Sequence, residues 1–137
     1  MRILIVESSY HAAVADHLSD GATGALGTGS GTFTRVSVPG VLELPGAVAL
    51  ASHHRNFDAY VALGCVIGEG VAAQTLYRET MRGLMQLSAH GVVVGNGVIF
   101  APDERAALAL AVAGDAGGDA ARAALALANL RERLAVL

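Results

Sequence analysis

Apolar runs alternate along this sequence with segments of helical spacing. Four runs rich in apolar and β-branched residues predict strands. The third run, AYVAL, is apolar throughout, which is typical of a strand buried on both faces of a sheet. The four predicted strands lie at residues 2–6, 33–38, 59–63 and 92–100.

The first two predicted helices lie on either side of the second strand. Ser8 or Ser9 can cap the first helix. Its apolar stripe recurs every four residues at Val14, Leu18, Ala22 and Leu26. After a turn at 39–40, Pro45 fits the first turn of a second helix that ends near His54.

Three more helices are predicted towards the end of the chain. Residues 102–104, Pro-Asp-Glu, suit a helix start by geometry and charge, and the glycine-containing segment 114–118 ends that helix. Asp119 can cap the last helix. The predicted apolar stripes are Tyr77, Met81, Leu84 and Met85 in the third helix, and Ala123, Leu127, Leu130 and Leu134 in the last.

This order of elements predicts one α/β domain over residues 1–137, with a four-stranded parallel sheet. The stretch 59–84 is its centre, because a buried strand there meets a glycine-containing turn and then a helix. In open α/β sheets, ligands bind beyond the carboxyl ends of the strands. We therefore expect the middle of any site near residues 66–73.

Glycines punctuate two further segments. GTGSGT, at 27–32, is predicted to be a flexible loop, and it lacks the Gly-Lys-Ser/Thr ending of a phosphate-binding P-loop. Gly95-Asn96-Gly97 lies inside the fourth strand. Glycine there indicates a bulge or the close approach of a ligand or another element.

Composition narrows the functional classes. Hydrophobic residues make up 53% of the chain, and the mean hydropathy is +0.51. No run reaches the ~18 apolar residues that span a bilayer, so the excess indicates burial in a parallel sheet or between subunits. The net charge is −3 and lysine is absent, which argues against a nucleic-acid partner. With one cysteine and no signal-peptide pattern, a cytoplasmic protein is expected.

Several polar residues have both a functional and a structural interpretation. Glu43, between two leucines, fits a ligand-binding group at a strand end and an N-terminal helix charge equally well. Glu69, between two glycines, can bind a ligand, although plain solvation is favoured. Tyr10 can stack on a planar ligand, but a tyrosine at the edge of a core is commoner.

The remaining candidates are weaker. Cys65 has no neighbouring charge to activate it, which favours a buried structural thiol. His53 and His54 are adjacent and face different sides of a helix, and no metal-ligand spacing occurs in the chain. His11, His17 and His90 are isolated and are expected at the surface.

Five segments carry a resemblance to a known family: VPGVLELP, YVALGCVIGE, RETMRGL, VGNGVI and GGDAARAALALANLRERL. In consistent order over nearly the whole chain, they resemble lumazine synthase, the penultimate enzyme of riboflavin biosynthesis. The resemblance implies a flavodoxin-like, three-layer α/β/α fold in a homopentamer, sometimes paired as a decamer or built into an icosahedral shell. It implies condensation of a ribitylamino-pyrimidinedione with dihydroxybutanone phosphate, at a site between subunits, without metal or organic cofactor.

The resemblance also implies roles for single residues. Tyr10 matches an aromatic that stacks on the pyrimidine, and Val66 and Ile67, followed here by Gly68 and Glu69, match pyrimidine contacts. Asn96 matches a residue that lines the same pocket from the neighbouring subunit. The segment that holds the ribityl chain is matched by Gly40, Val41, Leu42 and Glu43.

The chain departs from the family pattern at the charged positions. The family reads VI-Arg-Gly-x-Thr-x-His, where this chain reads VIGEGVA, so the Arg has no counterpart and the acid–base His becomes Ala72. A phosphate-binding Arg falls on Leu110 and a Lys on Ala116. The departures predict weak or lost activity and no catalytic residue at the family positions. The alternative is a non-catalytic protein that binds a lumazine or flavin or serves as a scaffold.

Overall fold

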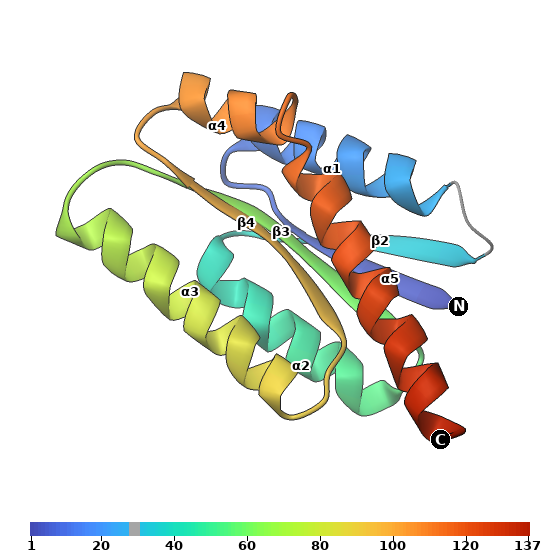
Figure 1. Cartoon of the computed structure of the whole chain (residues 1–137). Coiled ribbons are helices and arrows are strands. Elements are labelled where there is room, and N and C mark those ends of the chain that lie inside the picture. Colours follow the sequence, from blue (N-terminus) through green and yellow to red (C-terminus); the bar gives the residue numbers. More distant parts are fainter. Residues whose placement is uncertain (28–30) are drawn as a thin grey trace.

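A four-stranded parallel sheet lies between two layers of helices in the computed structural model, which describes residues 1–27 and 31–137 (Figure 1). Helices α1, α4 and α5 cover one face of the sheet, and α2 and α3 cover the other. The architecture is flavodoxin-like, as the sequence predicts. Part of the predicted loop 27–32, residues 28–30, lies outside the described residues.

The elements follow the predicted order. The strands are β1 (Arg2–Ser8), β2 (Thr32–Val38), β3 (Ala59–Ile67) and β4 (Val94–Ala101). The helices are α1 (Ala12–Leu26), a 3-10 turn η1 (Val41–Glu43), α2 (Leu44–His54), α3 (Val71–Ala89), α4 (Glu104–Ala111) and α5 (Ala116–Ala135).

The strand order is β2-β1-β3-β4, which makes β1 and β3 the central strands. Ile3 of β1 pairs with Phe33 on one side and with Ala59 on the other. From β1 the chain goes to one edge and then returns to the other side, so the direction of winding reverses between β1 and β3. In doubly wound sheets this reversal is where ligands bind.

Each face of the sheet carries its own core. Towards α1, α4 and α5 it contains Ile5, Leu63 and small residues of α5. Towards α2 and α3 it contains Val6, Tyr60 and Leu84. Alternate residues of β3 enter the two cores, which explains why the sequence of this strand is apolar throughout.

Three predictions about helix ends are wrong. Strand β1 extends to Ser8, and α1 begins after His11 without a side-chain cap, so neither serine caps it. Helix α4 already ends at Ala111, before the glycine segment. Asp115, not Asp119, caps α5 by accepting a hydrogen bond from the Gly118 amide at 3.3 Å.

The predicted stripe of α5 is also wrong. Ala123, Leu127, Leu130 and Leu134 are all exposed, and the helix buries its small residues instead. The reason is close packing: a Cβ added to Gly95 would lie 1.9 Å from the Ala120 carbonyl oxygen. The close approach predicted for glycine in β4 is therefore made by α5. In α3, Leu84 is buried but Met85 is 60% exposed, so Met85 does not belong to the buried stripe.

Candidate functional site

A cavity of about 600 Å³ opens at the carboxyl ends of β1 and β3, where the winding of the sheet reverses. Its size is within the usual range for small-molecule sites. The lining comes from the β1–α1 turn, η1, the end of β3 and the first turns of α3. The lining residues are Ser8, Tyr10, His11, Gly40, Val41, Leu42, Glu43, Cys65, Val66, Ile67, Gly68, Glu69, Ala72, Ala73 and Leu76.

Nine of the ten candidate binding residues from the sequence line this one cavity. The tenth, Asn96, lies on β4, where its Oδ1 accepts a hydrogen bond from the Val98 amide at 3.0 Å and its Nδ2 lies 3.1 Å from Met81 Sδ. Asn96 does not line the cavity of its own chain. Its contribution to a neighbouring subunit's cavity stays a prediction.

Glu43 lies both at the start of a helix and at the cavity, the two positions that the sequence left open for it. It directly precedes α2, and it lines the cavity. Its Oε1 accepts a hydrogen bond from the Gly40 amide at 3.1 Å, while the Glu43 amide donates to the Gly40 carbonyl at 3.3 Å. These reciprocal bonds close η1 and fix the carboxylate at the cavity wall.

The turn from β3 into α3 depends on two glycines. Gly68 has φ +148° and Gly70 has φ +96°, values that residues with a Cβ rarely adopt. The Gly68 amide donates to the Ala101 carbonyl at 3.0 Å, which anchors the turn to the end of β4. The turn places the first turn of α3, including Ala72, at the cavity.

Tyr10 and His11 form an aromatic pair at the cavity mouth. Tyr10 is 78% exposed, so it is not the core-edge tyrosine that is commoner in proteins. Its ring meets the His11 ring edge to face, with 4.9 Å between their centres. An exposed aromatic beside an apolar cavity offers a stacking surface to a planar ligand.

Cys65 lies at the cavity but is only 7% exposed. Burial raises the pKa of its thiol to about 11. The thiol therefore stays protonated near neutral pH and is a poor nucleophile. This agrees with a structural role.

The charges at the cavity are mainly negative. Glu43 and Glu69 line it, and no arginine is among its described lining residues. Leu110, 42% exposed on α4, and Ala116, the first residue of α5, do not line it either. In a single chain, the described lining residues therefore offer an anionic ligand no arginine or lysine, and His11 is the one among them that can carry a positive charge.

The sequence profile of 6,7-dimethyl-8-ribityllumazine synthase matches residues 1–132 of the chain. The chain belongs to the lumazine synthase family.

Individual relatives agree with the profile over nearly full length. The chain is 42% identical over 137 residues to the 6,7-dimethyl-8-ribityllumazine synthase of Sphingopyxis alaskensis, covering 98% of this chain and 97% of the relative. It is 43% identical over 135 residues to that of Novosphingobium aromaticivorans, covering 96% and 97%. A 6,7-dimethyl-8-ribityllumazine synthase 1 from Rhodopseudomonas palustris is 41% identical over 143 residues, covering 98% and 88%.

His11 is not among the candidate binding residues from the sequence, although its place next to Tyr10 makes it the one histidine expected near the pocket. The structure confirms that His11 lines the cavity. The available signal was its place directly after Tyr10, in the turn that follows a central strand.

None of the described helices is long and apolar enough to cross a membrane.

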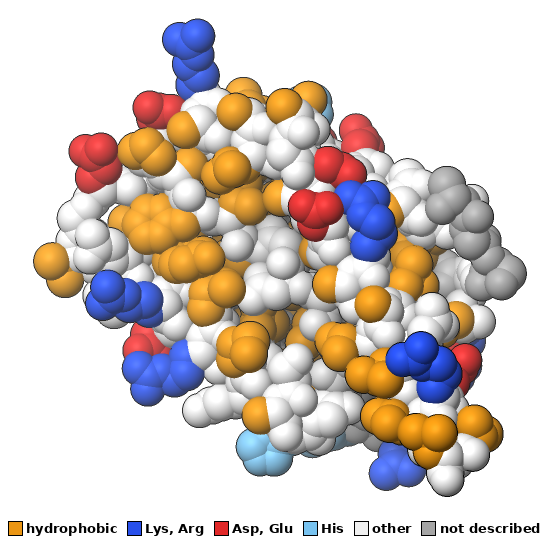
Figure 2. All heavy atoms as spheres, in the orientation of Figure 1, with side chains coloured by type: hydrophobic (Ala, Val, Ile, Leu, Met, Phe, Trp, Pro, Cys, Tyr) orange, Lys and Arg blue, Asp and Glu red, His pale blue; other side chains and the backbone are white. Residues whose placement is uncertain are grey.

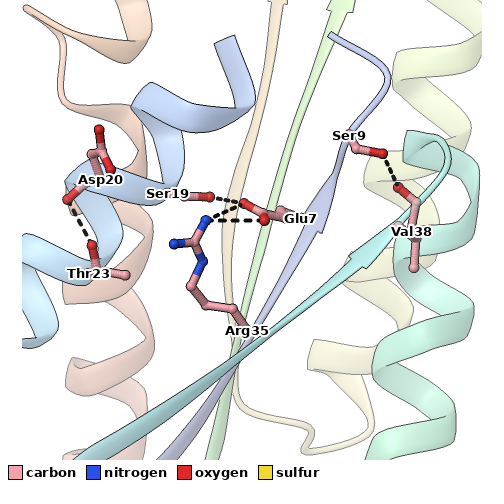
Figure 3. Close-up of polar contacts among 7 residues, drawn as sticks. All are labelled: Glu7, Ser9, Ser19, Asp20, Thr23, Arg35 and Val38. Atoms are coloured by element: carbon pink, nitrogen blue, oxygen red, sulfur yellow. Dashed lines mark hydrogen bonds and ion pairs between the residues drawn. The ribbon is translucent and has the colours of Figure 1, made fainter. Parts of the chain in front are cut away.

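A second polar cluster lies outside the cavity. Figure 3 shows Glu7 of β1 between Ser19 of α1 and Arg35 of β2. The Ser19 hydroxyl donates to Glu7 Oε2, and Arg35 Nη2 lies 3.2 Å from Glu7 Oε1. Ser19 is fully buried, so this bond satisfies a hydroxyl that has no access to water. We assign the cluster to structure, because it ties edge strand β2 to β1 and α1.

Proposed function

We infer that this chain binds a ribitylamino-pyrimidinedione in the cavity and condenses it slowly with dihydroxybutanone phosphate to 6,7-dimethyl-8-ribityllumazine. The observation that carries the proposal is the meeting of nine candidate binding residues at one cavity in a member of this family. Tyr10 supplies a face for the pyrimidine ring. Glu43, held by the Gly40 amide, has acceptor capacity left for ribityl hydroxyl groups.

The second substrate has weaker support in the cavity. A phosphate dianion needs cations or N–H donors to bind from dilute solution. The lining offers Glu43 and Glu69, which repel it. By the resemblance, Leu110 takes the place of the family's phosphate-binding arginine. The open N–H groups of the first turn of α3 supply part of the missing attraction.

Slow turnover remains feasible without the family's histidine. Holding two reactants in place can contribute ~7–11 kcal/mol to lowering the barrier in favourable cases. General acid–base catalysis contributes about 10²–10⁴-fold. Ala72 cannot titrate, so we expect activity lower by a factor in that range than in relatives that keep the histidine, with a higher KM for the phosphate substrate.

The test is steady-state turnover with both substrates. It is measured for the unmodified protein and for Ala72→His combined with Arg inserted after Ile67 and Leu110→Arg. A gain of at least tenfold in the restored variant supports the proposal, and Leu110→Gln in place of Leu110→Arg controls for polarity without charge. Ordinary family-level activity in the unmodified protein would show that the departures do not impair catalysis.

A non-catalytic binding or scaffold protein is the alternative, favoured by the absence of arginine and lysine among the described lining residues. It predicts saturable binding of riboflavin, the lumazine or the pyrimidine in calorimetry, but no turnover. If none of the three ligands binds, both versions fail.

We also propose a homopentamer, because the chain keeps more apolar surface than a lone domain needs. Phe33 and Val36 on β2 are each 41% exposed, and Leu134 on α5 is 58% exposed. Figure 2 shows hydrophobic side chains gathered around the C-terminal part of α5. Light scattering at micromolar concentration tests this, and a monomer would contradict it.

A further inference from the structure

His11 is placed to move protons in the cavity. It lies in the turn between the central strand β1 and α1, and it lines the cavity beside Tyr10. Its carbonyl accepts the Ala15 amide of α1 at 2.9 Å, so the backbone is fixed independently of the ring. Among the described residues, the ring has no hydrogen-bond partner, which leaves both ring nitrogens available to a ligand.

The other titratable groups that line the cavity are less suited to the task. On β3, Cys65 keeps its proton because burial raises its thiol pKa to about 11. On η1, the Glu43 carboxylate is held by the Gly40 amide. Glu69, on the β3–α3 turn, is exposed to solvent. Tyr10 lies in the same turn as His11, but a tyrosine hydroxyl ordinarily keeps its proton at neutral pH. Histidine is the side-chain type that both gives and takes protons between pH 5 and 8.

The placement of His11 also fits the proposed ligand. A planar ligand stacked on Tyr10 has the His11 ring as its neighbour, because the two ring centres are 4.9 Å apart. His17, the next histidine along the chain, is exposed on α1 and does not line the cavity. His11 is thus distinguished by position and not only by residue type.

We propose that His11 is the proton-transfer residue of this chain, acting from the β1–α1 turn instead of from the first turn of α3. The inference rests on the proposed function. In the first step, the pyrimidine amino nitrogen bonds to the ketone carbon, the C=O π electron pair moves to the oxygen, and His11 carries one proton from the nitrogen to that oxygen. In the second step, protonated His11 gives its proton to the resulting hydroxyl group, which leaves as water while the nitrogen electron pair forms the C=N bond. Neutral His11 then removes the remaining N–H proton, which leaves the neutral imine and restores protonated His11.

The experiment compares His11→Asn, in the β1–α1 turn, with His17→Asn on the following helix α1 as a matched control. Ligand binding is measured first, by calorimetry with the pyrimidine substrate at pH 7, and then kcat is measured from pH 5 to 9. We expect His11→Asn to lower kcat by about 10²-fold and to remove the fall of kcat at acid pH. The affinity should change much less, and His17→Asn should change neither quantity.

Two further measurements separate proton transfer from a structural role. Added imidazole should raise the turnover of His11→Ala but not that of the unmodified protein. In the Ala72→His background, His11→Asn should cost less than in the unmodified background, because two residues acting in one step are not additive.

The outcomes distinguish this inference from the proposed function. Binding without turnover, or equal kcat and pH profiles in His11→Asn and the unmodified protein, overturns the role of His11 and leaves ligand binding standing. Absence of binding to the unmodified protein overturns the proposed function, and this inference falls with it. If His11→Asn no longer shows the fall of kcat at acid pH, and imidazole raises the turnover of His11→Ala, the result supports both the role of His11 and the proposed function.

Discussion

The two faces of the sheet are packed in opposite ways. On the α1, α4 and α5 face, a Cβ on Gly117 would lie 1.9 Å from the Leu18 carbonyl oxygen, so backbone meets backbone between α5 and α1. On the α2 and α3 face, larger side chains such as Tyr60 and Leu84 fill the core. The cavity opens beside this core, at the carboxyl ends of β1 and β3. Stability and binding are therefore separated. The tightly packed face fixes the strands, and the ends of those strands carry the site.

The largest effect is expected from adding one methyl group to the tight face. Gly117→Ala forces a contact with backbone that cannot rotate away, so we expect a loss of about 3 kcal/mol or more in the free energy of unfolding. Urea denaturation measures it. Gly24→Ala on α1 is the matched control, because a Cβ there meets nothing within 4 Å. It should gain about 0.5–1 kcal/mol from helix propensity. A loss below ~1 kcal/mol in Gly117→Ala would show that the two faces are packed alike.

The second prediction concerns Cys65, whose side chain belongs to the tight face although it reaches the cavity. Because burial raises its pKa from 9.0 to about 11, the thiolate fraction at pH 8 falls about a hundredfold. Alkylation by iodoacetamide should be slower by that factor than in urea-unfolded protein. As the pH rises, the thiol of Cys65 loses its proton in the unfolded chain before it does in the folded protein. The contribution of the protonated thiol to the free energy of unfolding is therefore lost between about pH 9 and 11. Equal rates in folded and unfolded protein would place the thiol in solvent.

Tyr10 tests the open face. It is 78% exposed, so Tyr10→Ala should change the free energy of unfolding by less than about 0.5 kcal/mol. It should weaken riboflavin or lumazine binding by about 0.5–1.5 kcal/mol, which is roughly 2- to 13-fold in Kd. Fluorescence titration measures the affinity. Val71→Ala, equally exposed but outside the cavity lining, is the control. Unchanged affinity in Tyr10→Ala would remove the stacking role.

Arg35 carries the smallest expected effect. Its ion pair with Glu7 is partly exposed, 41% and 17% for the two side chains, so Arg35→Ala should cost between about 0 and 1 kcal/mol. The difference from the unmodified protein should shrink as salt is added, because screening weakens the pair. Thermal unfolding at two ionic strengths measures it. A larger, salt-independent loss would mean that edge strand β2 depends on this arginine for packing.

The order of elements and the place of the cavity were predictable from the sequence, because strand runs and glycine turns have strong local signals. The buried face of α5 was not. Leucines at 127, 130 and 134 give the stronger apolar stripe. The close contacts of α5 with helix α1 at Gly117 and with strand β4 at Ala120 instead require glycine or alanine. Hydrophobicity alone cannot detect a requirement for smallness.

The candidate site was predictable in its residues more than in its chemistry. The resemblance located the residues that line the cavity, from Tyr10 to Glu69, but His11 has no match in it. Its availability depends on where the β1–α1 turn lies relative to β3, which is a three-dimensional fact. The sequence also left both interpretations of Glu43 open, and the hydrogen bond from the Gly40 amide explains how one carboxylate occupies both positions.

The position of β1 inside the sheet has a consequence for biosynthesis. This strand is synthesised well before its inner partner β3, which begins only at Ala59. At ~5–20 residues per second, roughly 3–10 s pass between the synthesis of the two strands. For that time the backbone N–H and C=O groups of β1 that pair with β3 lack their partners in the nascent chain. Until β3 emerges, water has to satisfy these groups, and they can pair with the edge of another chain.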